Sequence, residues 1–507
     1  MIRSLFALLF MLMLPGIAHA DWYEASSAHF LVYSTDRPER LQKYAADLER
    51  FDQAVRAMRQ MPDEPVGRAN RLTVYTLGST DAVGRLFGNS GVAGFYNARA
   101  GGSVAFAPRD AGGESQFELG RQAILFHEYA HHLMFGTYVH SAFPSWMVEG
   151  WAEFHATARL NRDGSVLFGA SPNYRAWGLV SGNPLPLERI LSDDTGKLTD
   201  EQSDALYGRG WLLIHYLTFE PSRAGQLKQY VASINSGKTP AQAATVFGDL
   251  RALHHELERY IGKSKISAYN VAANRLHIGD VTIRRLTPGE AATMDVRIRS
   301  KRGVDEKTAP AVYAAAKKAA APYPNDPGAQ VVLAEAAYDA GDYAGSEAAA
   351  DRAIAADAKA IDGHVYKAMA KMAVAAAAKD YSRETWSNIR KIIAAANHVD
   401  PDDPEPLVLY FRSFTEAGVA PSPNAKDGLY RAFELCPQDR GLRLMVAQLY
   451  LRDDNPAVAR ALLRLIAYDP HSGSMAAVAM KMIADIDRRF PPPPAVAPET
   501  PKPAPAP

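Results

Sequence analysis

Two histidines and a glutamate at helical spacing constrain the fold of this 507-residue chain more than any other feature. His127, Glu128 and His131 spell H-E-x-x-H inside the apolar stretch 123–135, which Gly136 ends. Because residues four apart lie above one another on an α-helix, the two imidazoles can bind one tetrahedral Zn²⁺ while Glu128 faces a water as general base. The alternative is a chance match on a buried helix. The motif predicts a zinc site on a core helix.

A second segment offers a third metal ligand. Residues 144–153 read Pro-Ser-Trp-Met-Val-Glu-Gly-Trp-Ala-Glu, and they follow the first motif after an interval long enough for the chain to turn. We expect them to form a second helix that lies back over the first and delivers Glu149 to the metal. Glu153 comes one helical turn after Glu149.

The two motifs together resemble a known family. H-E-x-x-H followed by W-x-x-E-G-x-A-E is similar to the gluzincin metallopeptidases, in particular the peptidase-MA-like branch related to the aminopeptidases. The resemblance implies that His127, His131 and Glu149 bind Zn²⁺. It also implies that Glu128 is the general base and that Glu153 supports a ligand imidazole from outside the metal shell. The alternative assignment makes Glu153 the ligand and Glu149 a structural residue.

A later helix is expected to supply a group that stabilises the oxyanion formed when a metal-bound hydroxide attacks a carbonyl. Residues 204–217 resemble the downstream family helix that reads Y-x-x-x-W-x-L-x-x-Y-L, which makes Tyr207 the candidate. A half-buried core tyrosine without a catalytic role is the alternative.

The segment before the metal helix departs from the aminopeptidase pattern. Those enzymes have a Gly-x-Met-Glu-Asn strand whose Glu binds the substrate amine, whereas residues 94–106 contain no such motif. This absence favours an endopeptidase. The segment predicts a hairpin that turns at Gly101 and Gly102, with 104–106 as an edge strand for an extended peptide. A hairpin with only a structural role is the alternative.

The predicted fold class is α+β followed by all-α. Strands at 29–34 and 71–76, a helix at 38–58 and the hairpin predict a small mixed sheet. Further helices are predicted at 145–160, 202–219, 223–235, 240–247 and 249–262. The resemblance to gluzincins implies that residues 21–267 form a gluzincin-type domain with a helical lower lobe. Strand-like tracts at 281–285 and 294–299 predict a short β hairpin and linker over 268–305.

The C-terminal part is expected to be a helical repeat domain over 306–490. Residues 334–349 resemble a tetratricopeptide repeat, and Pro401, Pro437 and Pro470 are separated by 36 and 33 residues. The stretch 357–400 is longer than one repeat. Stacked helix pairs would contact their neighbours rather than the zinc cleft and would recognise a peptide or protein partner. The alternative is a plain helical bundle. The Pro-rich residues 491–507 predict a disordered tail.

The first twenty residues predict export. Arg3, an apolar run over 5–14 and the small-residue site Ala18-His-Ala20 are typical of a signal peptide covering 1–20, which implies a periplasmic or secreted protein. A membrane anchor is the alternative. Cys436 is the only cysteine, which excludes an internal disulfide and indicates a core residue.

Composition limits the partners. Fifty-six basic residues balance fifty-six acidic ones, so no net charge favours nucleic acid, and no second apolar run predicts membrane insertion. We expect a zinc metallopeptidase that acts on a peptide or protein substrate and that recognises partners through its repeats. The alternative is a protein that retains zinc without proteolysis and acts as a scaffold through the same repeats.

Overall fold

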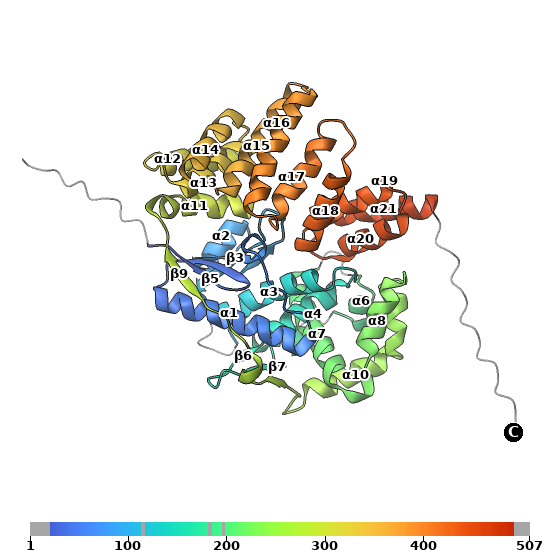
Figure 1. Ribbon diagram of the computed structural model, residues 1–507. Coiled ribbons are helices and arrows are strands. Elements are labelled where there is room, and N and C mark those ends of the chain that lie inside the picture. The colour runs from blue at the N-terminus through green and yellow to red at the C-terminus, as the bar shows by residue number, and fades with distance from the viewer. Residues whose placement is uncertain (1–20, 113–116, 181–184, 195–197, 491–507) are drawn as a thin grey trace, which may run out of the picture.

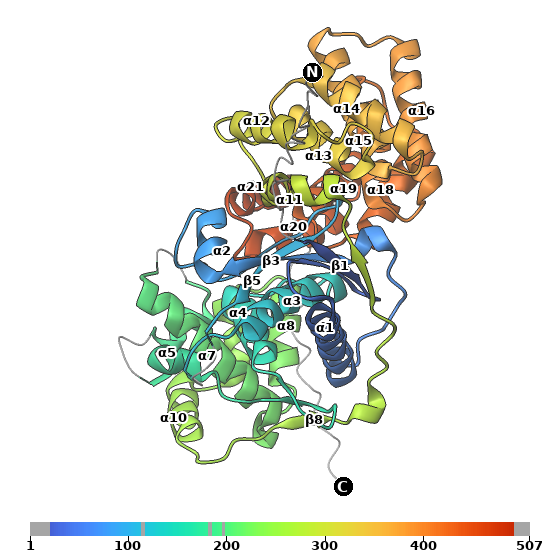
Figure 2. The ribbon, with the colours of Figure 1, turned by 90° about the vertical axis from the view of Figure 1, so that its left-hand side faces the viewer.

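The computed structural model describes residues 21–112, 117–180, 185–194 and 198–490, so the predicted signal peptide and tail lie outside the described residues. The molecule is arranged in three levels (Figures 1 and 2). A β-sheet with flanking helices occupies the middle, a helical subdomain lies below it, and the C-terminal helices lie above both. The sheet therefore lies between two helical layers.

A six-stranded sheet forms the middle level, in the order β4-β5-β3-β2-β1-β9. Its strands are β1 (Tyr23–Ser26), β2 (Phe30–Ser34), β3 (Leu72–Ser79), β4 (Phe95–Asn97), β5 (Val104–Asp110) and β9 (Thr282–Arg285). The β2–β3 and β3–β5 pairs are parallel and the other pairs antiparallel. The predicted strands and hairpin are present. The prediction that 104–106 is an edge strand is wrong, because β5 pairs on both sides and β4 is the edge.

Alternating residues of the sheet are buried on opposite faces. Phe30 and Val32 face one hydrophobic core, whereas Leu31 and Tyr33 face another. Helices α1 (Pro38–Arg59) and α3 (Arg121–Thr137) cover the first face, and α2 (Thr80–Phe87) and α11 (Pro288–Arg302) cover the second. The helix that carries the H-E-x-x-H motif, called the metal-motif helix below, is thus α3, and it packs directly against the sheet.

The expected hairpin over 281–299 is wrong in its second half. Residues 282–285 form β9, but β9 pairs with the N-terminal strand β1, and residues 294–299 belong to α11. Thr287 and Glu290 form a capping box that starts this helix. Met294 packs on the sheet side and Val296 on the opposite side. A helix buried on two sides gave the alternating pattern that indicated a strand.

The lower level is helical, as expected. It contains α4 (Ser145–Ala156), α5 (Ala176–Val180), α6 (Leu187–Leu191), α7 (Asp200–Phe219), α8 (Gln226–Asn235), α9 (Pro240–Ala243) and α10 (Leu250–Ile261), with a small sheet of β6 (Arg159–Leu160), β7 (Val166–Phe168) and β8 (Tyr269–Val271). Every residue of α4 is buried. Helices α4 and α7 cross backbone to backbone at Gly150 and Gly210, where a Cβ on Gly150 would lie 2.4 Å from the Gly210 carbonyl carbon.

Stacked antiparallel helices form the upper level, which we call the array. They are α12 (Ala309–Ala320), α13 (Pro327–Asp339), α14 (Tyr343–Ala356), α15 (Ile361–Ala377), α16 (Arg383–Val399), α17 (Pro404–Thr415), α18 (Pro423–Leu435), α19 (Arg440–Arg452), α20 (Pro456–Tyr468) and α21 (Ser474–Arg489). Alternate helices begin at residues 327, 361, 404, 440 and 474, which gives intervals of 34, 43, 36 and 34 residues. The long second interval is the off-register stretch seen in the sequence.

The array does not stay clear of the rest of the molecule, so that expectation is wrong. Asp439 accepts a 2.7 Å hydrogen bond from the Ala100 amide in the β4–β5 turn. Arg443 donates to the Val139 carbonyl just after α3, at 2.8 Å. Ala100 is buried in the hydrophobic core of the array itself. The C-terminal helices α18–α21 therefore lie over the metal-motif helix (Figure 1).

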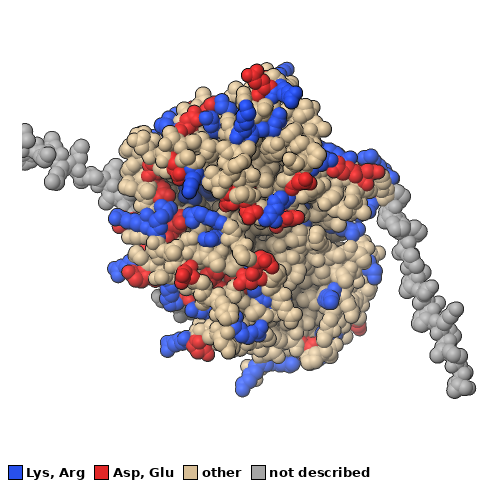
Figure 3. Space-filling model, in the orientation of Figure 1, with Lys and Arg blue, Asp and Glu red and all other residues tan. Residues whose placement is uncertain are grey.

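Surface charge is mixed on the face that Figure 3 shows, where basic and acidic side chains are interspersed. In the described part of the chain, no helix is both long enough and apolar enough to cross a bilayer. Cys436 is buried in the array, and burial raises the pKa of its thiol, as expected for a core residue.

Candidate metal centre

Helix α3 presents the two motif histidines toward one point. The Nε2 atoms of His127 and His131 lie 3.1 Å apart, and the two rings are nearly perpendicular. His131 is buried and His127 is half-buried. Apolar neighbours on the same helix, Phe126 and Ala130, pack into the core below the sheet and fix the helix rotation. The four-residue spacing thus places both imidazoles on one side of α3.

Helix α4 adds Glu149 to this pair. Its Oε2 atom lies 3.3 Å from Nε2 of His127 and 3.7 Å from Nε2 of His131. Ligand atoms on a tetrahedral zinc at about 2.0–2.1 Å are about 3.3 Å apart, so the three atoms have the separations that zinc requires. The same Oε2 is buried and has no hydrogen-bond partner among the described residues. The residues present therefore fit a zinc ion.

The ionisation of these groups reflects their mutual contact. Burial opposes the charge of Glu149, yet the imidazoles of His471 and His127 hold the pKa of its carboxyl well below the ordinary value. Burial also opposes protonation of His127, but Glu149 and Glu153 raise the pKa of its imidazole to about 10. A metal that bound here would displace that proton, because zinc binds neutral imidazole.

Glu153 contacts His127 on the Nδ1 side of its imidazole. Its Oε1 lies 3.4 Å from Nδ1 of His127 and accepts a 2.8 Å hydrogen bond from Arg175, while its Oε2 accepts a 2.8 Å bond from the Tyr174 hydroxyl. Burial opposes the charge of Glu153, but Arg175 and His127 together outweigh burial and lower the pKa of its carboxyl to about 2. Glu153 lies on the Nδ1 side of the imidazole and Glu149 on the Nε2 side. This geometry favours Glu149 over Glu153 as the metal ligand.

Glu128 is half-buried, and burial raises the pKa of its carboxyl. Its side-chain stem lies against Gly94, just before the edge strand β4. A Cβ at Gly94 would lie 3.6 Å from Cγ of Glu128 and 2.4 Å from the Ile124 side chain. The edge strand β4 therefore begins directly against α3, beside Glu128.

Helix α7 places Tyr207 beside the same cluster. Its ring stacks on His127 with centroids 5.7 Å apart, and the Arg175 guanidinium lies 4.8 Å above it. The charge of Glu149, followed by burial, holds the pKa of the Tyr207 hydroxyl well above its ordinary value. The hydroxyl is therefore a hydrogen-bond donor, which is the form that an oxyanion needs.

One histidine at this site is not predicted by any sequence pattern. His471 comes from the loop between α20 and α21 of the array, and its Nε2 lies 2.9 Å from Oε1 of Glu149. Its ring centroid is 4.9 Å from that of His131. The flanking Asp-Pro-His-Ser-Gly sequence resembles an ordinary solvent-exposed turn. Only the docking of the array brings His471 to this cluster.

A second cluster contains residue types that can bind metals, but its acidic groups are paired with basic side chains. His29, Asp52 and Asp63 lie within reach of one another. His29 Nδ1 is 2.8 Å from Glu49, and Asp52 is 2.8 Å from Arg56, so the acidic groups already have basic partners. We interpret this cluster as an ion-pair network, buried except at Asp63, that fixes α1 to the start of β2.

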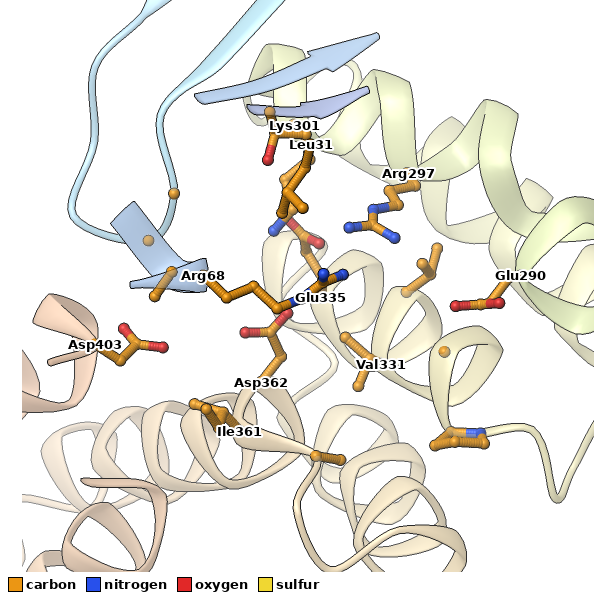
Figure 4. Close-up of a pocket in the computed structure, with 18 of the residues that line it drawn as sticks. Leu31, Arg68, Glu290, Arg297, Lys301, Val331, Glu335, Ile361, Asp362 and Asp403 are labelled. Atoms are coloured by element: carbon orange, nitrogen blue, oxygen red, sulfur yellow. The ribbon is translucent and has the colours of Figure 1, made fainter. Parts of the chain in front are cut away.

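A separate cavity of about 440 Å³ lies between the sheet and the array. Figure 4 shows basic side chains such as Arg68 and Arg297 directed toward acidic ones such as Glu335 and Asp362. Burial and neighbouring acids raise the pKa of Glu405 in this cavity to about 7. The cavity lining includes none of the metal-site residues.

No protein-family model and no curated protein matches this chain. Solved structures that resemble it include a thermophilic TPR protein from Thermus thermophilus, at 16% identity over 39% of this chain and 99% of that protein, with a TM-score of 0.33. A MamA RS-1 double mutant matches at 12% identity over 40% and 97%, with a TM-score of 0.27. Yeast Tom70 matches at 13% identity over 62% and 68%, with a TM-score of 0.26. At such scores, the description of the array as TPR-like helix pairs depends on its own packing.

Proposed function

We propose that this protein is an exported zinc metallopeptidase in which His127, His131 and Glu149 bind the metal. The observation that carries the proposal is the spacing of the three ligand atoms at 3.1, 3.3 and 3.7 Å, together with the buried Glu149 oxygen that lacks a hydrogen bond. Three protein ligands leave one tetrahedral position open, which is typical of catalytic rather than structural zinc.

The side chains around the cluster have the chemistry of amide hydrolysis. A bound zinc would supply a Lewis acid and would lower the pKa of a water molecule. Glu128 is placed to take a proton from the attacking water and to return it to the leaving amine. The Tyr207 hydroxyl is placed to donate a hydrogen bond to the oxyanion, and Glu153 holds the ring of His127 in orientation.

A peptide substrate is supported by the edge strand β4. An extended peptide that paired with β4 would run past Glu128, because the residue before this strand, Gly94, packs on the Glu128 stem. Strand addition holds the peptide by its main chain and leaves side-chain preference to the neighbouring pockets. The missing amine anchor makes an internal peptide bond the expected site of cleavage.

The direct test is digestion of an unstructured peptide library by the purified protein. We expect cleavage that a chelator abolishes and that zinc restores. Glu128→Gln should keep about one zinc per chain and lose about 10²–10⁴-fold in turnover, since its amide cannot accept the proton. Glu188→Gln, an exposed position on α6, is the matched control and should cleave normally. Full zinc occupancy without cleavage of any peptide would contradict the proposal.

A second candidate function is protein recognition by a zinc-retaining scaffold. The observation that favours it is the charged cavity between the sheet and the array. A partner segment with both charges would pair with its basic and acidic walls. The variant Asp362→Lys should then weaken capture of partners while zinc content stays at the wild-type level. Equal capture by the variant and the wild type would contradict this function.

Export belongs to the same proposal. A signal peptidase that removed residues 1–20 would leave Asp21 as the mature N-terminus. Mass spectrometry of the protein recovered from the periplasm or the medium measures this directly. Retention of Met1 would contradict export by this route.

A further inference from the structure

The array closes over the metal centre and contributes a side chain to it. His471 extends from the array to a proposed metal ligand, and its Nε2 is 2.9 Å from Oε1 of Glu149. The other oxygen of the same carboxylate faces His127 and His131. One carboxylate oxygen of Glu149 thus faces the proposed metal position, and the other contacts the array.

The loop that carries His471 is internally braced. Asp469 accepts a 2.9 Å hydrogen bond from the backbone amide of His471 and a 3.2 Å bond from the Ser472 hydroxyl. The Asp469 carboxylate also forms an ion pair with Arg440 on α19, and Arg440 lies over the Phe135 ring on the metal helix. The position of His471 is therefore set by packing that spans both parts of the molecule.

We propose that His471 is a positioning residue that orients the carboxylate of Glu149, so that the array is a structural part of the metal centre. The inference depends on the proposed zinc site. A hydrogen bond to the outer oxygen of a ligand carboxylate limits its rotation and aims the inner oxygen at the metal, as Glu153 does for the ring of His127. Metal affinity then depends on a residue more than 300 positions beyond its ligand in the sequence.

The test is an equilibrium competition between the full-length protein and a fluorescent zinc chelator. His471→Ala should bind zinc about 10- to 100-fold more weakly, the usual effect of losing a group that orients a ligand. His471→Gln should recover most of the affinity, because its side-chain amide can donate to the same oxygen. His398→Ala, at an exposed histidine of the array, should leave the affinity unchanged.

The outcomes distinguish misfolding, loss of the positioning role and failure of the proposed zinc site. His471 also pairs with Glu149 when no metal is bound, so His471→Ala should melt below the wild type without zinc. Cooperative unfolding of the zinc-free variants well above the temperature of the titration separates a metal effect from misfolding. Wild-type affinity in His471→Ala, or no recovery in His471→Gln, overturns the positioning role. Failure of the wild type itself to bind zinc overturns the proposed function instead.

Discussion

The close crossing of α4 and α7 gives a prediction with a calculable size. Gly150 lies directly after the proposed ligand Glu149, and a Cβ there would stand 2.4 Å from both the carbonyl carbon and the oxygen of Gly210. Carbon atoms in contact are normally about 3.5–4.0 Å apart, so Gly150→Ala must separate α4 from α7 by about 1 Å. The obstructing atoms are backbone and cannot rotate away.

This separation should be costly for stability. Overpacking costs about 1–3 kcal/mol, and the upper end applies because α4 is buried along its whole length. Replacing glycine by alanine in a helix returns about 0.5–1 kcal/mol, so the net loss should be about 2 kcal/mol. Glu149 moves with its helix, and zinc affinity should fall by about tenfold or more, as for other losses of ligand orientation.

The assay is urea unfolding of zinc-free protein, followed by zinc competition titration. Gly136→Ala is the matched control: it is also a helical glycine, but the nearest atom to its Cβ is Oε1 of Gln438 at 3.8 Å. The control should be within about 1 kcal/mol of the wild type, on the stable side, with unchanged zinc affinity. If Gly150→Ala were as stable as the control and bound zinc equally well, the close crossing of α4 and α7 would be refuted.

Three further outcomes are expected. His131→Ala should lose zinc, measured as metal content after gel filtration, because two ligands cannot hold the ion; full occupancy would exclude His131 as a ligand. The double variant His29→Gln/Glu49→Gln should lose stability mainly between about pH 4.5 and 6.5. Burial opposes both charges, yet their contact raises the pKa of His29 and lowers that of Glu49. The stability contributed by His29 is therefore lost as pH rises through its folded pKa, and that contributed by Glu49 as pH falls through its own. Equal losses in urea midpoint at about pH 5.5 and 8.5 would contradict this. A chain ending at residue 305 should be poorly soluble, because it exposes the face of α11 around Val296 that the array covers; a soluble, zinc-binding fragment would contradict this.

Local features of the site could be predicted because they depend on short-range periodicity. The four-residue spacing of His127 and His131 is sufficient to place both rings on one face of α3. The alternation of strands 30–34 and 72–76 is sufficient to build the sheet on which α3 rests. Motif resemblance then extended the site to Glu149 on α4, whose Oε2 lies 3.3 Å from His127.

The errors arise where an element is covered by a part of the chain that is distant in sequence. Met294 and Val296 alternate because α11 is buried between the sheet and the array, and periodicity cannot separate this pattern from that of a strand. The likeness to gluzincins predicts β5 at an edge, whereas β5 pairs with the distant strand β3 on one side and with β4 on the other. In both cases the deciding contact is tertiary.

The docking of the array is the feature that no local pattern predicts. It is encoded by single residues in separate turns: Ala100 between β4 and β5, Asp439 before α19, and His471 before α21. Each has only a weak signal in the sequence, since small and polar residues are ordinary in turns. Their contacts join the array to the β4–β5 turn and to Glu149 on α4. A partner that displaced the Ala100 turn from the array would therefore disturb the same interface that brings His471 to Glu149, so binding of a partner at this turn would be coupled to the proposed metal site.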